Sequence, residues 1–128
     1  MKKMKSKFHT VPEMLDHHVF RHGLDGVLRN PRVLISFVRK EKTEQPKGVV
    51  VAVGSGSEFA LGWSLCHRLD KNDWDRKFAL DVAIGRACRN FTSEEVAKKS
   101  YDKLPQTLEQ PIDQIFTRAK NYFRDPSK

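Results

Sequence analysis

Three runs of strand-forming residues follow one another along the chain, and their short spacing constrains the fold more than any other feature. The runs are 32–39, 48–53 and 58–66, and each is rich in β-branched or aromatic residues. A charged linker with a proline separates the first two, and the tight turn Gly54-Ser55-Gly56-Ser57 separates the last two. Linkers of this length favour antiparallel hairpins, because parallel strands need a long crossover. The sequence therefore predicts a small three-stranded antiparallel sheet.

Helical periodicity is found on both sides of the strand region. Residues 10–13 form a capping box with a proline in the first turn, and helical spacing then extends over 11–22. A central helix is predicted over 74–89, with Asn72 or Asp73 as its N-cap.

Further helices are predicted in the last third of the chain. A second capping box opens a short helix over 92–101, and Pro105 ends it. A last helix with an apolar stripe extends to about Phe123. The expected fold class is α+β, a small antiparallel sheet with the helices packed on one face. We expect a disordered basic arm over 1–9 and a single domain over 10–125.

The formal net charge of +8 is the strongest signal from the whole chain. Such an excess attracts polyanions and phosphates over long distances. The charge does not distinguish nucleic acid, a free nucleotide and an acidic protein as partners. A net charge of this size can also have no role beyond keeping the protein soluble.

The compartment is indicated by the cysteines and by the lack of long apolar runs. Cys66 and Cys88 are far apart and match no C-x-x-C pattern, which favours a reducing environment. No apolar run is long enough to span a membrane, and no secretory signal follows the basic start. A soluble protein of the cytoplasm is expected.

Motifs of catalysis are missing from the sequence. Cys66-His67 offers a thiol and an imidazole, but neighbours on a strand point to opposite faces. The turn at 54–57 lacks the following helix that a phosphate loop needs. We expect a protein that is not an enzyme and that uses no cofactor.

Three histidines lie close together in the first predicted helix. His18 and His22 share a face as a metal-binding pair would, with His17 beside them. No carboxylate completes an H-E-x-x-H pattern, and two ligands do not make a site unless Cys66 and His67 approach in space. No metal ion is expected, and the histidines are predicted to border the core or an anionic surface.

Two ionic residues lie within the apolar arc of the central helix. Lys77 and Asp81 are four residues apart, a spacing at which an exposed pair contributes about 0.3 kcal/mol. The alternative is that Asp81 orients a cation or a ligand, because a buried carboxylate needs a partner.

Arginines and aromatic residues are concentrated in the second half of the chain. They are Arg86, Arg89, Phe91, Tyr101, Phe116, Arg118, Tyr122 and Phe123. Arginine offers a planar fork for phosphate and an aromatic face can stack on a base, so these residues could form a nucleotide pocket. Alternatively, Phe116 and Phe123 belong to the apolar stripe, and Arg118 is a solvated surface residue.

Four segments resemble a pattern of small phage-encoded proteins. They are Gly62-Trp63-Ser64-Leu65-Cys66, Asp73-Trp74-Asp75-Arg76-Lys77, Ala83-Ile84-Gly85-Arg86-Ala87 and Arg118-Ala119-Lys120-Asn121-Tyr122-Phe123. In size and order the chain is similar, over 49–123, to phage anti-Thoeris sponge proteins, which sequester cyclic ADP-ribose-type immune signals without degrading them. The resemblance implies a homo-oligomer with ligand between subunits, Phe91 stacking on adenine and Arg118 holding phosphate.

The leading hypothesis is therefore sequestration of a phosphorylated adenine nucleotide, cyclic ADP-ribose-like, that counters host immune signalling. Phe91 would stack, Arg118 and Arg86 would meet phosphate, and Arg89 and Asp81 complete the candidate site. The alternative is a nucleic-acid-binding module that uses the basic arm and the helices. A third class is an interaction protein that occludes an acidic partner.

Overall fold

The structure is a computed structural model that describes residues 10–39, 46–56, 58–65, 76–91 and 106–123. The elements are α1 (Val11–Arg21), β1 (Arg32–Arg39), β2 (Pro46–Ser55), β3 (Glu58–Leu65), α2 (Arg76–Phe91) and α4 (Gln106–Tyr122), in that order. The predicted arm at 1–9, the helix over 92–101, Cys66, His67 and Tyr101 lie outside the described residues. Among the described residues, no helix is long and apolar enough to cross a membrane.

The three strands form one antiparallel sheet with β2 in the middle. Val51 of β2 pairs with Ile35 of β1 on one side and with Gly62 of β3 on the other. Ser55 pairs with Glu58 at the tight turn, where Gly56 has a positive φ of 62°. The α+β class and the three-stranded antiparallel sheet are confirmed.

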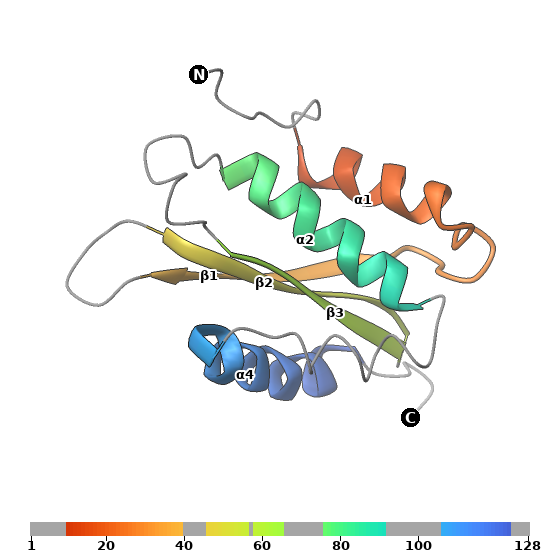
Figure 1. Cartoon of the computed structure of the whole chain (residues 1–128). Coiled ribbons are helices and arrows are strands. Elements are labelled where there is room, and N and C mark those ends of the chain that lie inside the picture. The colour runs from red at the N-terminus through yellow and green to blue at the C-terminus, as the bar shows by residue number, and fades with distance from the viewer. Residues whose placement is uncertain (1–9, 40–45, 57, 66–75, 92–105, 124–128) are drawn as a thin grey trace, which may run out of the picture.

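The helices cover both faces of the sheet, whereas the sequence had indicated one face only. Figure 1 shows α1 and α2 side by side on one face and α4 on the other. Val49, Val51 and Val53 of β2 pack in the core beneath α1 and α2. Val50 and Ala52 pack in a second core against α4. Since alternate residues of a strand point to opposite faces, β2 is buried on both sides.

Helix α1 begins as its capping box predicts. Thr10 adopts an extended backbone, and its hydroxyl oxygen accepts a hydrogen bond of 3.3 Å from the backbone N–H of Glu13. Met14, Leu15, His18 and Val19 form the buried stripe of the helix. That stripe faces the sheet and α2, so His18 is drawn into the interior with the apolar residues.

Helix α4 forms the second layer with the apolar stripe that the sequence predicts. Leu108, Ile112, Ile115 and Ala119 are buried against the sheet, and Phe123 follows just after the helix. The ring of Phe123 stacks on Phe59, with centroids 5.8 Å apart. Phe116 packs against the same core, so the structural alternative for Phe116 and Phe123 is confirmed.

Candidate functional site

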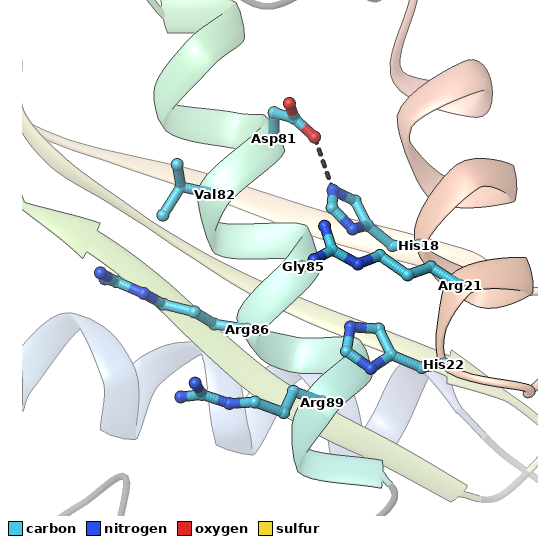
Figure 2. A pocket seen from close by; sticks show the side chains of 8 residues that line it. All are labelled: His18, Arg21, His22, Asp81, Val82, Gly85, Arg86 and Arg89. Carbon is cyan, nitrogen blue, oxygen red and sulfur yellow. Dashed lines mark hydrogen bonds and ion pairs between the residues drawn. The ribbon is translucent and has the colours of Figure 1, made fainter.

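A groove of about 350 Å³ lies where the C-terminal halves of α1 and α2 meet. It is lined by His18, Arg21, His22, Asp81, Val82, Gly85, Arg86 and Arg89. Figure 2 shows Arg21 and His22 pointing from α1 toward α2, with Arg86 and Arg89 extending from α2 away from α1. The groove is therefore broad, and cationic side chains line it on both sides of α2.

His18 and Asp81 join the two helices at one end of this groove. His18 Nε2 and Asp81 Oδ1 are 2.5 Å apart, and the two side chains are only 10% and 17% exposed. An ionised carboxylate accepts hydrogen bonds and cannot donate, so Nε2 carries the proton of this bond. The partner of Asp81 thus comes from another helix, a contact that the spacing within α2 does not predict.

The His18 ring lies directly against the backbone of Gly85. A Cβ at position 85 would be 2.8 Å from Cε1 of His18 and 3.1 Å from Nδ1. Real Cβ atoms do not come that close, so a side chain at Gly85 would displace the imidazole. Nδ1 is buried and has no hydrogen-bond partner among the described residues. Asp81 and Gly85 together hold the ring in one position.

Arg86 is held in place by the edge strand β3. Its Nη1 donates a 2.8 Å hydrogen bond to the carbonyl oxygen of Trp63, and its guanidinium lies 5.0 Å from the centroid of the Trp63 ring. Arginine has five N–H donors, so donors remain for a ligand. Burial, and secondarily the charge of Arg89, lower the pKa of Arg86. Since the ordinary pKa of arginine lies far above neutral pH, the group stays charged at pH 7.

His22 borders the groove close to basic residues. Its pKa is lowered from 6.5, first by burial and then by His18, Arg21 and Arg89. At neutral pH the ring is therefore uncharged and can accept or donate a hydrogen bond.

The charge balance of the groove favours an anion. Three guanidinium groups, those of Arg21, Arg86 and Arg89, line it together with one carboxylate. That carboxylate, Asp81, is already bonded to His18. Guanidinium groups bind phosphate and carboxylate oxygens by paired hydrogen bonds. The described residues hold no group of three or more His, Cys, Asp or Glu side chains suited to a metal ion.

The structure brings together three of the five predicted site residues. Asp81, Arg86 and Arg89 line the groove. Phe91 lies at the end of α2, partly buried against the core beneath α1 and α2. Arg118 is exposed on α4, which covers the opposite face of the sheet. Phe91 and Arg118 therefore do not share this groove within one chain.

Sequence reasoning missed Arg21 of α1. His18, Arg21 and His22 line the groove, and the two histidines were predicted to border the core or an anionic surface, with metal binding as the alternative. The available signal was the place of His18 on the apolar stripe of α1, since a buried imidazole needs a hydrogen-bond partner.

The fold and the groove define a small α+β protein with a cationic surface site. Comparison of the chain with protein-family models, with curated proteins and with solved structures found no match.

Proposed function

We propose that this protein binds a small phosphate-bearing molecule in the groove between α1 and α2 and leaves it chemically unchanged. The observation that carries the proposal is that Arg21, Arg86 and Arg89 line one groove, in which the carboxylate of Asp81 is already bonded to His18. The described lining thus holds three guanidinium groups and one carboxylate. An anionic group such as phosphate suits this excess of guanidinium groups.

The size of the groove fits a small molecule. Its volume of about 350 Å³ lies within the range of roughly 300–1,000 Å³ that is usual for ligand sites. Arg86 is fixed by the carbonyl and ring of Trp63 before any ligand arrives. A fixed donor loses little side-chain entropy on binding, which favours affinity.

The lining residues favour binding over catalysis. Those that the structure describes include no hydroxyl, thiol or amine that could serve as a nucleophile. Nδ1 of His18 is buried against Gly85 and does not reach a ligand in the groove. The described lining therefore favours capture of a ligand over its conversion.

The ligand class includes the cyclic ADP-ribose-type signals that the resemblance suggests. Within one chain, such a ligand would depend on Arg21, Arg86 and Arg89. A joint contribution from Phe91 and Arg118 would require an interface between copies of the chain, because these two residues lie on opposite faces of the sheet. The proposal therefore includes a homo-oligomer when the ligand is a full nucleotide.

Nucleic acid is the second candidate, and the breadth of the groove favours it. Cationic side chains spread across α2 without enclosing a cavity, as Figure 2 shows. Such an arrangement can follow a phosphate backbone, and affinity would then fall steeply with salt. A site for one small phosphate ligand neutralises fewer charges and depends on salt far less.

Calorimetry on the purified protein tests the proposal. Cyclic ADP-ribose isomers, AMP and a short DNA duplex are titrated at two salt concentrations. We expect saturable binding of a phosphate-bearing small molecule, with affinity reduced about tenfold by Arg21→Gln or Arg89→Gln. Lys77→Gln is the matched control, since it removes one charge from α2 outside the groove.

Two results would count against the proposal. Equal affinities for Arg21→Gln, Arg89→Gln and Lys77→Gln would remove the groove as the site. Binding of the duplex alone, with a steep dependence on salt, would replace the small-molecule function by the nucleic-acid function.

A further inference from the structure

A second hollow, of about 230 Å³, lies at the end of the sheet where β1 starts and β2 turns into β3. Its lining combines arginines, the turn and the end of α4: Arg29, Asn30, Arg32, Gly54, Ser55, Gly56, Tyr122 and Phe123. None of these residues is acidic. The residues are distinct from those of the groove between α1 and α2, so the inference does not depend on the proposed function.

The backbone around this hollow is held in a defined shape. The hydroxyl of Ser55 donates a hydrogen bond to the carbonyl oxygen of Arg29, which ties the segment before β1 to the β2–β3 turn. Asn30 has a positive φ of 49°, and Gly56 one of 62°. Both values belong to the left-handed region that asparagine and glycine tolerate best. Arg29 and Arg32 are therefore presented from a fixed segment.

Aromatic rings form one wall of the hollow. Phe123 is only 5% exposed, while Tyr122 is 46% exposed. The two rings meet edge to face, with centroids 5.0 Å apart. The guanidinium of Arg32 lies 5.9 Å from the centroid of the Tyr122 ring. That distance is the outer limit of a cation–π contact, so a ligand can draw the guanidinium away at little cost.

The charges fit a phosphate group. Arg29 and Arg32 are both exposed, and both line the hollow. The nearest carboxylate along the turn belongs to Glu58, which pairs with Ser55 in the sheet and does not line the hollow. Two guanidinium groups match the charge of a phosphate monoester, and the exposed face of Tyr122 offers a surface on which a planar ring can stack.

We propose that this hollow is a second ligand site, which binds a phosphate monoester carried on a flat ring. Arg29 and Arg32 hold the phosphate oxygens, and Tyr122 contacts the ring.

Amide NMR of the full chain tests this site, with phenyl phosphate and inorganic phosphate as probes at fixed ionic strength. Phenyl phosphate should shift the amide signals of Gly54, Ser55 and Gly56 in a saturable manner. Arg29→Gln and Arg32→Gln should each weaken its binding about tenfold. Lys120→Gln, which removes an equal charge from α4 outside the hollow, should leave it unchanged.

The contribution of the ring is tested separately. Phenyl phosphate should bind about fivefold more tightly than inorganic phosphate, which is the lower end of the effect of stacking. Tyr122→Leu should remove this preference, and Tyr122 is exposed, so the variant should fold. Equal affinity of the two probes for the unaltered protein would overturn the ring contact.

Other outcomes would overturn the second site as a whole. These are shifts that do not saturate, or equal affinities of Arg32→Gln and Lys120→Gln. Shifts confined to amides around Gly85 would assign the binding to the groove between α1 and α2. That last result would refute the second site and would leave the proposed function intact.

Discussion

His18 Nε2 lies 2.5 Å from Asp81 Oδ1, and this bond joins α1 to α2 across 63 residues of sequence. Both side chains are largely buried, and Gly85 leaves the room that the imidazole occupies. The bond fixes the relative position of the two helices that line the cationic groove. The stability of this helix pair and the shape of the groove therefore both depend on the bond between His18 and Asp81.

A double-mutant cycle should measure the coupling between these two residues. His18→Ala and Asp81→Ala each remove one partner, and we expect a coupling energy of about 1–3 kcal/mol in urea unfolding, because the bond is shielded from water. Additive effects of the two substitutions would show that the pair contributes no energy of its own.

Gly85→Ala should destabilise the protein by about 1–3 kcal/mol, because the new methyl group overlaps the His18 ring. The midpoint of urea unfolding measures the effect. Gly26→Ala is the matched control, since a Cβ there meets nothing within 4 Å. Without the overlap, Gly85→Ala would unfold at a urea concentration equal to or above that of the unaltered protein, because alanine favours a helix over glycine.

The edge strand β3 should depend on Asn90 of α2. Asn90 is 7% exposed, and its Nδ2 donates a 2.6 Å hydrogen bond to the carbonyl oxygen of Leu61. Asn90→Ala leaves that carbonyl without its partner and should cost about 1–3 kcal/mol. Asn90→Asp should cost more, because it places a second acceptor against the carbonyl. Thermal unfolding of both variants measures the two costs. A higher melting temperature for Asn90→Asp than for Asn90→Ala would contradict the predicted order.

His22 should make stability fall as the pH falls. Its pKa is lowered in the folded protein, chiefly by burial, so the unfolded chain binds a proton at a higher pH than the folded chain. Folding is then opposed as the pH drops below 6.5, and the loss is complete below the folded pKa. His22→Gln should flatten that part of the profile of unfolding free energy against pH. An unchanged slope between the two proteins would contradict the burial of the ring.

The strand pattern could be predicted from local sequence because hairpins are local. β1 was predicted at its observed bounds, 32–39, and α1 was predicted over 11–22 and is found at Val11–Arg21. The placement of the helices on one face was wrong. The sequence signal for helices on both faces was the unbroken apolar run Val49–Val53, which is fully buried. A strand covered on one side alternates between apolar and polar residues instead.

For the candidate site, the sequence identified Asp81 by its place within the apolar arc of the central helix, and Arg86 and Arg89 by the concentration of arginines in the second half of the chain. It could not supply His18, Arg21 and His22, since the approach of α1 to α2 depends on how both helices pack on β2.

The sequence by itself determined the local elements of this protein, its cationic character and the residue types available for binding. Helix caps, strand alternation and charge act over a few residues and need no knowledge of the rest. Only the tertiary structure decided that Asp81 meets His18, that Arg86 rests on Trp63, and that Phe91 and Arg118 lie apart. Those relations arise from packing between segments distant in sequence, and that packing is set by how the two cores close around the central strand.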